Sequence, residues 1–150
     1  MKQKTIIQLW GKQGCGKSGT IKILKEELIR HYINSAHTYS LPLPASPDIF
    51  DILLCGGLTV GVESMGDDLW SYNLKGNLDK LIGCDIIICA SRVYNNVDAY
   101  IKDISKTNGY RLLKVTNYRG DEPPFVRHIL NQKSAIHLLD LINQIITGAL

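Results

Sequence analysis

No long hydrophobic run occurs anywhere in the 150-residue sequence. A membrane-spanning helix needs roughly 18 or more consecutive apolar residues, and no stretch of this chain reaches that length. The apolar run before Gly11 is also too short to form the core of a signal peptide. We therefore expect a soluble, cytoplasmic protein with no membrane partner.

Patterns typical of metal sites and disulfide frameworks are missing as well. No two of the cysteines (Cys15, Cys55, Cys84 and Cys89) form a CxxC pair, and each lies in or beside an apolar or glycine-rich stretch. We interpret them as reduced thiols. The histidines do not have the spacing of a metal-binding pair or a catalytic triad. The sequence therefore argues against a structural zinc site.

The chain carries little excess charge. There are 17 Lys and Arg residues against 14 Asp and Glu residues, which gives a formal net charge of +3. This excess is too small to indicate a nucleic-acid or membrane-surface protein. Hydrophobic residues make up 45% and charged residues 21%, which excludes a disordered, collagen-like or low-complexity chain. The length predicts one domain over residues 1–150.

Short apolar runs alternate with amphipathic stretches along the chain. Apolar runs predict strands at 5–10, 49–55, 58–63, 84–90 and 110–116. Helical spacing predicts helices at 17–33, about 67–81, 96–107 and 135–146. This alternation predicts an α/β fold.

Some local signals refine these elements. The Gly56-Gly57 pair between two strands predicts an antiparallel hairpin, and the continuous apolar run 84–90 predicts a strand in the middle of the sheet. Three prolines in 34–47 predict a surface loop there. Ser134 is the expected N-cap of the last helix.

One motif carries the functional prediction. Residues 11–18, GKQGCGKS, match the phosphate-loop pattern GxxxxGK[ST] at every fixed position. The motif lies between a predicted strand and a predicted helix, which is the context that phosphate binding requires. The predicted nucleotide-binding residues are Gly11, Lys12, Gln13, Gly14, Cys15, Gly16, Lys17, Ser18, Gly19 and Thr20.

Each part of the motif has its own physical role. The glycines allow the backbone N–H groups from about Gly14 to Ser18 to surround an anion. Lys17 is placed to reach the β- and γ-phosphates, and Ser18 offers a hydroxyl ligand to Mg²⁺. The Thr20 hydroxyl is a candidate contact to the α-phosphate. We interpret Cys15 as a small space-filling residue rather than a redox group.

On these residues, the chain resembles the P-loop NTPase superfamily. The resemblance implies a three-layer α/β/α fold with a mostly parallel sheet and one antiparallel hairpin strand. It also implies binding of a nucleoside triphosphate with Mg²⁺, usually followed by hydrolysis or phosphoryl transfer. The order of elements is similar to the GTPase-like and kinase-like branch, where the second hairpin strand ends beside the phosphate loop with an acidic residue. Glu63 occupies that position.

The acidic residues near this strand end allow two interpretations. GTPases have DxxG at this point, with an Asp that holds Mg²⁺ through water, and the matching residues here are Glu63-Ser-Met-Gly66. The predicted metal ligands are Ser18, Glu63 and Asp67, with Asp68 as an alternative. The same acids also fit a simple strand-to-helix turn with a helix cap.

The sequence specifies the nucleobase and the catalytic residues less closely than the phosphate loop. GTPases recognise guanine through NKxD, whereas this chain has Thr116-Asn-Tyr-Arg-Gly-Asp121. We therefore expect ATP rather than GTP, with Asn117 as a possible base contact. The predicted catalytic residues are Lys17, Glu63, Arg92 and Arg119.

Several other side chains are secondary candidates. Ser91 is a candidate sensor of the γ-phosphate. Arg119 and Arg127 lie in or near a proline-bearing loop at 121–125, which is a candidate lid that supplies charge to the transition state. Each arginine is equally consistent with a solvated surface residue. Tyr94 and Tyr118 follow strand ends and are candidate aromatic contacts in a ligand pocket.

Two classes of function follow. The first is a Mg²⁺-dependent enzyme that either hydrolyses a nucleoside triphosphate or passes its γ-phosphoryl group to a small molecule or nucleotide. The second is a nucleotide-binding switch or scaffold that turns over little and acts through a protein partner. Nucleic acid is not an expected partner.

Overall fold

The computed structural model describes residues 2–12, 14–32, 37–40, 48–66, 74–93, 96–119 and 123–150, with the backbone alone at 37–40 and 74. The elements in chain order are β1 (Thr5–Trp10), α1 (Lys17–His31), β2 (His37–Ser40), β3 (Phe50–Cys55), β4 (Leu58–Glu63), α2 (Leu74–Leu81), β5 (Ile86–Ser91), α3 (Val97–Thr107), β6 (Arg111–Thr116) and α4 (Pro124–Thr147).

The six strands form one sheet in the order β2-β3-β4-β5-β1-β6. Strands β4, β5, β1 and β6 are parallel, whereas β3 is antiparallel to both β2 and β4. The predicted α/β fold with a mostly parallel sheet is confirmed. The strand β5 lies in mid-sheet as predicted, and it separates β4 from β1.

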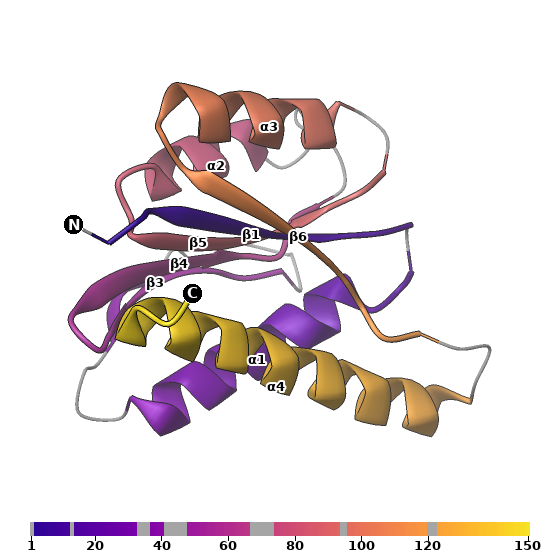
Figure 1. The fold of residues 1–150 in the computed structure, drawn as a ribbon. Helices are drawn as coiled ribbons and strands as arrows, with labels where there is room; N and C mark the ends of the chain where they lie inside the picture. The colour runs from indigo at the N-terminus through magenta and orange to yellow at the C-terminus, as the bar shows by residue number, and fades with distance from the viewer. Residues whose placement is uncertain are drawn as a thin grey trace.

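The helices lie on both sides of the sheet. Helices α2 and α3 cover one face, and α1 and α4 cover the other (Figure 1). Alternate residues of β1 point to opposite faces, so Ile7 and Leu9 pack with α1 and α4, while Ile6 packs with α2 and α3. The result is an α/β/α arrangement with one apolar core on each side of the sheet.

The hairpin and the two middle helices follow the sequence signals closely. Gly56 and Gly57 connect β3 to β4 with φ of 55° and 81°, the left-handed conformation that a tight primed turn requires. Helix α2 overlaps its prediction at 74–81, and the predicted residues 67–73 lie outside the described residues. Helix α3 begins after Asn96, but the Asn96 side chain makes no capping hydrogen bond.

Two sequence predictions are wrong. The segment 34–47 is not entirely a loop, because β2 forms at His37–Ser40 and pairs with β3. Helix α4 begins at Pro124 rather than at 135, so Ser134 lies inside the helix and is not its N-cap. The first turns of α4 are largely exposed, and the prolines at their start indicate a loop in the sequence, although proline is tolerated in the first turn of a helix.

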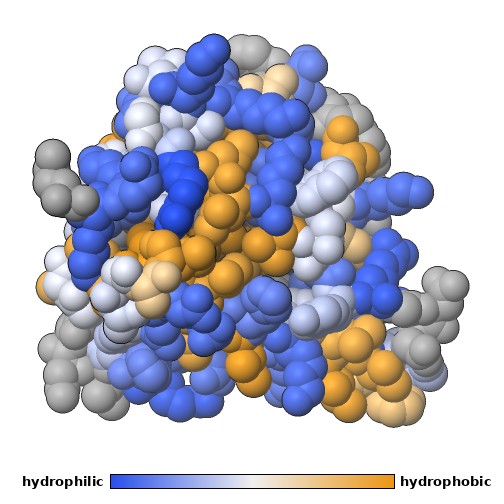
Figure 2. Space-filling view, in the orientation of Figure 1, coloured by the Kyte–Doolittle hydropathy of each residue, from blue (hydrophilic) through white to orange (hydrophobic). Residues whose placement is uncertain are grey.

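Figure 2 shows the side of the molecule on which β6 and α4 face the viewer. Hydrophobic surface gathers in the middle of this side, and a second group covers the first half of α4, where Phe125 is 69% exposed. Within the described ranges, no helix combines the length and the apolar character needed to cross a membrane.

Candidate functional site

The connection from β1 to α1 forms an open cleft at the carboxyl edge of the sheet. Gly14 and Gly16 have φ of 75° and 88°, a backbone conformation that favours glycine. Gly16 precedes the first helical residue and provides no side-chain cap, and the first turn of α1 contains no acidic residue. The Thr20 N–H donates to the Gly16 carbonyl at 2.9 Å, whereas the N–H groups of residues 17–19 have no carbonyl partner within the helix and are available to an anion.

This cleft has a volume of about 270 Å³. Its lining residues are Gly14, Cys15, Gly16, Lys17, Ser18, Gly19, Ser64, Gly66 and Arg127. Six of them belong to the predicted phosphate loop and helix start. Gly66 also lies at the cleft, which is the place that the resemblance to DxxG implies.

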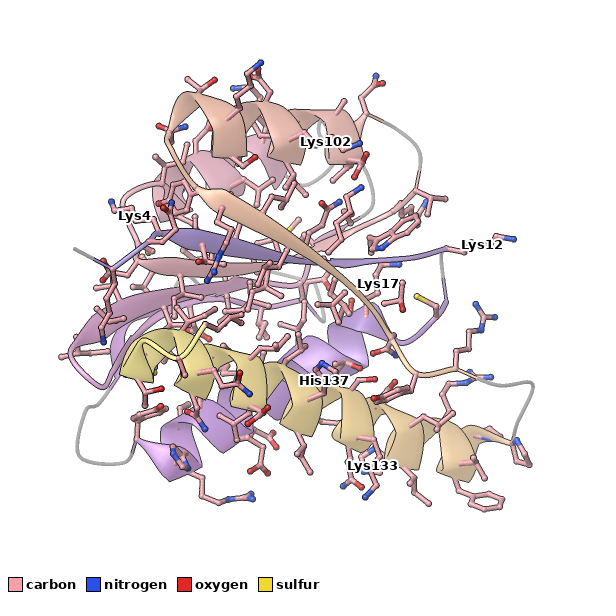
Figure 3. All side chains as sticks on the ribbon, viewed as in Figure 1. Lys4, Lys12, Lys17, Lys102, Lys133 and His137 are labelled. Atoms are coloured by element: carbon pink, nitrogen blue, oxygen red, sulfur yellow. The ribbon has the colours of Figure 1, made fainter. Side chains whose placement is uncertain are left out.

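The Lys17 ammonium group lies on the loop itself. Its Nζ donates to the carbonyl oxygens of Gly11 at 2.8 Å and Lys12 at 2.9 Å, and it lies 3.5 Å from Cys15 Sγ. The side chain is only 7% exposed. Figure 3 shows Lys17 near the start of α1, whereas Lys12 extends away from the protein. Lys17 is therefore the lysine that the fold holds inside the cleft.

A group of oxygen atoms surrounds the Ser18 hydroxyl. Ser18 Oγ donates to Asp48 Oδ1 at 3.1 Å and to the Ser64 carbonyl oxygen at 3.3 Å. The Ser64 hydroxyl donates to the same Asp48 oxygen at 2.9 Å. Carboxylate, hydroxyl and carbonyl oxygens are the ligands that hard cations such as Mg²⁺ prefer. Asp48, Ser18 and Ser64 therefore form a fitting donor set beside the phosphate loop.

Asp48 is the functional candidate that sequence reasoning missed. The residue lies just before β3, which is antiparallel to β4, and Phe50 at the start of β3 pairs with Glu63 at the end of β4. The beginning of β3 therefore lies at the same sheet edge as the phosphate loop. The predicted hairpin already contained this signal, because the start of one hairpin strand lies beside the end of the other.

Glu63 lies on the other side of the sheet from α1. Val60 and Val62 belong to the core under α1 and α4, so strand alternation directs Glu63 toward α2 and α3. Glu63 is fully buried and its Oε1 accepts a hydrogen bond from the Met65 N–H. Burial raises the pKa of the Cys89 thiol, and the nearby Glu63 charge raises it further. Glu63 is not among the residues that line the cleft.

The remaining predicted metal and loop residues cannot be compared with the structure. Asp67, Asp68 and Gln13 lie outside the described residues. Across the described part of the chain, no group of three or more His, Cys, Asp or Glu residues is arranged to hold a metal ion.

Among the arginines, Arg127 is the one that lines the cleft. It lies in the first turns of α4, in a helix rather than in the predicted loop. Arg119 is exposed just after β6, and Arg92 donates its backbone N–H to the Gly66 carbonyl at 2.9 Å. Neither Arg92 nor Arg119 contributes to the cleft lining.

The Ser91 hydroxyl is buried and used elsewhere. It accepts a hydrogen bond from Gln8 Nε2 at 2.7 Å, while the Ser91 carbonyl accepts the Gly11 N–H at 3.1 Å. The contact to the phosphate loop is thus made by the Ser91 backbone. Tyr94, the other candidate after this strand, lies outside the described residues.

The Asn117 side chain contacts the phosphate loop and does not point into an open pocket for a base. Its Nδ2 donates to the Cys15 carbonyl at 2.8 Å and to Asn131 Oδ1 at 2.9 Å. Its Oδ1 accepts a hydrogen bond from Thr20 Oγ1 at 2.5 Å. Asn117 was the predicted contact to the base, and Thr20 was the predicted contact to the α-phosphate. In the structure their side chains are hydrogen-bonded to each other instead.

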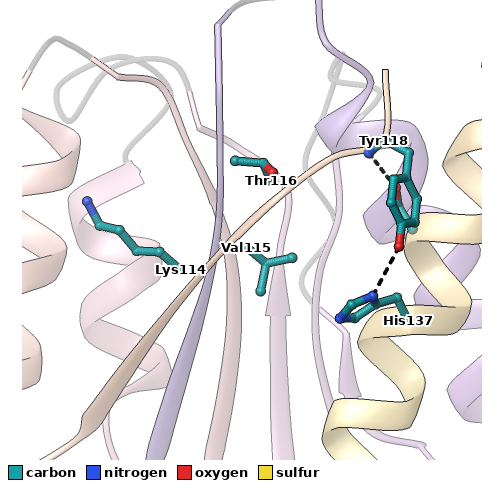
Figure 4. A pocket seen from close by; sticks show the side chains of 6 residues that line it. Lys114, Val115, Thr116, Tyr118 and His137 are labelled. Carbon is teal, nitrogen blue, oxygen red and sulfur yellow. Dashed lines mark hydrogen bonds between the residues drawn. The ribbon is translucent and has the colours of Figure 1, made fainter. Parts of the chain in front are cut away.

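A second cavity lies next to this contact, between β6 and α4. Its volume is about 310 Å³, and Figure 4 shows the residues that line it: Lys114, Val115, Thr116, Tyr118, Ser134 and His137. The Tyr118 N–H donates to Ser134 Oγ at 2.8 Å, and the Tyr118 hydroxyl lies 3.3 Å from His137 Nδ1. Tyr118 thus lines a cavity, as its position after the strand suggested, and Ser134 fixes the backbone there.

Comparison of the chain with protein-family models, with curated proteins and with solved structures finds no match. Function must therefore be inferred from the chemistry of the cleft.

Proposed function

We propose that this chain is a P-loop NTPase-type protein that binds a nucleoside triphosphate with Mg²⁺ and hydrolyses it or transfers its γ-phosphoryl group. The observation that carries the proposal is the cleft itself. It combines a glycine-rich loop with left-handed turns, an uncapped helix start and the buried Lys17. Backbone N–H groups, a helix N-terminus and a lysine together favour a polyphosphate over a neutral ligand.

Lys17 can exchange its partners without losing hydrogen bonds. In the structure it donates to the carbonyls of Gly11 and Lys12. A bound β- or γ-phosphate offers negatively charged oxygens in place of these neutral carbonyls, which adds attraction between opposite charges to the hydrogen bonds of the ammonium group. This exchange favours binding, since the ammonium group is already held at the cleft.

The donor set around Ser18 fits Mg²⁺. We propose that the Ser18 hydroxyl and the Asp48 carboxylate hold the cation beside the triphosphate, with the Ser64 carbonyl close to Ser18 and the Ser64 hydroxyl close to Asp48. The ion would neutralise phosphate charge and polarise the reacting phosphoryl group. Asp67 remains a predicted ligand, and Glu63 would act from its buried position only through neighbouring groups.

Arg127 is the proposed source of additional positive charge at the cleft. Phosphoryl transfer depends mainly on positioning and on stabilising the charge of the transferring group. Arg127 lines the same cleft as Lys17 and Ser18, so it can serve the role first assigned to Arg92 and Arg119. Because Asn117 is bonded to the loop, it is not available to read guanine, which supports ATP over GTP.

A second candidate function is a nucleotide-binding switch that acts through a protein partner. One observation favours it: among the described residues, no carboxylate lines the cleft. The described lining of the cleft therefore offers no carboxylate as a general base to a water molecule or an acceptor hydroxyl. Exposed Phe125 and Ile129, on the helix that carries Arg127, offer apolar surface close to the site.

The test compares nucleotide binding and turnover in the wild type, Lys17→Ala and Lys12→Ala. Calorimetry with ATP or GTP and Mg²⁺ should show binding that Lys17→Ala weakens about 10- to 150-fold, the worth of a charged hydrogen bond. Lys12→Ala is the matched control. Lys12 was predicted among the nucleotide-binding residues, but its side chain extends away from the protein and is not part of the cleft lining, so the variant should bind like the wild type. Equal affinity in all three proteins would refute the phosphate-loop proposal.

Product analysis then separates the two functions. Phosphate release without an acceptor identifies a hydrolase, and ADP formation that depends on a nucleoside or nucleotide acceptor identifies a kinase. Tight binding without product over hours identifies the switch. Melting temperatures of the variants establish that each protein is folded.

A further inference from the structure

Asn117 connects three separate segments at the back of the phosphate loop. Its amide nitrogen donates to the Cys15 carbonyl in the loop and to Asn131 Oδ1 in α4. Its amide oxygen accepts from the Thr20 hydroxyl in the first turn of α1. The carbonyl of Cys15 can only accept, so this contact fixes which end of the Asn117 amide is the donor.

Asn131 approaches the same turn closely enough to limit its side chains. A Cβ atom placed on Gly16 would lie 2.4 Å from Asn131 Oδ1, and one on Gly19 would lie 2.8 Å from Asn131 Nδ2. The phosphate-loop pattern requires glycine at position 16 but not at position 19. The close approach of Asn131 therefore accounts for Gly19, a residue that the motif leaves unexplained.

We propose that Asn117 and Asn131 are positioning residues that hold the phosphate loop in its anion-binding conformation. The carbonyl and N–H groups of a trans peptide point in opposite directions. Holding the Cys15 carbonyl on Asn117 therefore fixes the Gly16 N–H on the opposite side, where the cleft lies. The proposal rests on the proposed function of the cleft, and it adds that β6 and α4 set the geometry of the loop.

Binding of Mg²⁺-tripolyphosphate and Mg²⁺-ATP to Asn117→Ala and Asn131→Ala tests this inference. Tripolyphosphate has no base or ribose, so a direct contact of Asn117 to the base would leave its binding unchanged. A positioning role weakens both ligands equally, by about tenfold, because one ordinary hydrogen bond is lost from the loop. The double variant should lose little more than either single one, since the residues act together.

Asn108→Ala is the matched control, because Asn108 Nδ2 donates to the Ile104 carbonyl at the end of α3, away from the cleft. It should bind both ligands like the wild type. If Asn117→Ala weakens ATP but not tripolyphosphate, Asn117 contacts the nucleoside and the inference is wrong. If both ligands bind with wild-type affinity, the loop does not depend on the asparagines and the inference is also wrong.

Amide hydrogen exchange of the ligand-free protein provides a readout that does not depend on binding. In Asn117→Ala and Asn131→Ala, we expect exchange at residues 14–19 to rise at least several-fold while exchange in α3 stays constant. Unchanged exchange at the loop would overturn the inference. If the wild type binds neither ligand, the proposed function fails, and the exchange data still decide whether the asparagines hold the loop.

Discussion

The two faces of the sheet use their polar residues differently. Toward α1 and α4, polar side chains contact the backbone and side chains of the phosphate loop and helix start, as Asn117 does with Cys15 and Thr20. Toward α2 and α3, a network around Asp98 joins polar side chains to one another. Gln8 Nε2 donates to Asp98 Oδ1 at 2.8 Å, and Asp98 also pairs with Lys102 at 2.8 Å and with Lys114 at 2.5 Å.

The second network connects α3 to the strands without reaching the cleft. Gln8 lies on β1, Lys114 on β6 and Asp98 on α3, and none of them lines the cleft. Lys114 also lies over the Trp10 ring, 5.0 Å from its centroid. The comparison shows two roles for polar groups in one small fold. The group around Asn117 shapes the cleft, and the group around Asp98 stabilises the packing of α3 on the sheet. The separation is open to mutagenesis.

The largest expected effect comes from adding one methyl group at Gly16. A left-handed conformation costs a non-glycine residue roughly 1 to 2 kcal/mol, and Gly16→Ala also places Cβ against Asn131 and Asn117. We expect chemical denaturation to show a loss of about 2 to 4 kcal/mol in the free energy of unfolding. We also expect nucleotide affinity to fall below detection in calorimetry.

Gly14→Ala is the matched control for this prediction. Gly14 has a similar φ of 75°, but a Cβ atom there meets nothing within 4 Å. It should therefore lose only the backbone contribution, about 1 to 2 kcal/mol. Equal losses in the two variants would show that contact with α4 does not matter, and the distinction between the two faces would weaken.

Asp48→Asn should affect the response to magnesium more than stability. The substitution keeps the shape of the side chain but removes its charge, so the Ser18–Asp48 donor set holds a cation less well. We expect ATP affinity in saturating Mg²⁺ to fall about tenfold, a change worth about 1.4 kcal/mol. With EDTA in place of Mg²⁺, the variant should bind at least as well as the wild type, because repulsion of phosphate is smaller.

Glu63→Gln sharpens the same prediction, because both carboxylates lie near the end of β4 but on different sides of the sheet. If Glu63 is not a metal ligand, its variant should show the same ratio of affinities with and without Mg²⁺ as the wild type. If Glu63→Gln lowers the ratio of ATP affinities with and without Mg²⁺ more than Asp48→Asn does, Glu63 rather than Asp48 is the metal ligand.

Most of the fold could be predicted because the spacing of apolar residues in the sequence indicates which residues are buried. The strand β1 matches its predicted range, and β5 is buried along its whole length, as its continuous apolar run indicates. Two segments were missed. The strand β2 lies at the edge of the sheet in a proline-containing segment, and the first turns of α4 bury the polar Asn131 instead of an apolar stripe.

The site could be predicted only where residues are close in sequence. The phosphate loop is a local motif, so its cleft-lining glycines, Lys17 and Ser18 were identified directly. Asp48 and Asn131 depend on pairings between distant segments, and Arg127 was a candidate only through its position near a proline-bearing loop. Arg127 is brought to the cleft only because α4 begins early and packs along α1, and no spacing within the sequence records that contact.

The smallest expected effect comes from Asp98→Asn, on the face that does not contribute to the cleft. Burial by itself would raise the Asp98 pKa, but hydrogen bonds from Lys102, Lys114 and Gln8 outweigh it and hold the pKa below the ordinary value of 3.8. A lowered pKa in the folded state gives stability that is present above pH 3.8 and is lost as the pH falls through the folded value.

Because both lysines are partly exposed, we expect Asp98→Asn to cost less than about 1 kcal/mol at pH 7. Thermal unfolding should show this difference shrinking below pH 3.8, while exposed Asp103→Asn on the same helix should show a smaller difference at every pH. Nucleotide affinity should not change in either variant, because neither side chain lines the cleft. If Asp98→Asn weakens nucleotide binding as much as it weakens stability, the two polar networks are coupled through β1, and the two faces do not have separate roles.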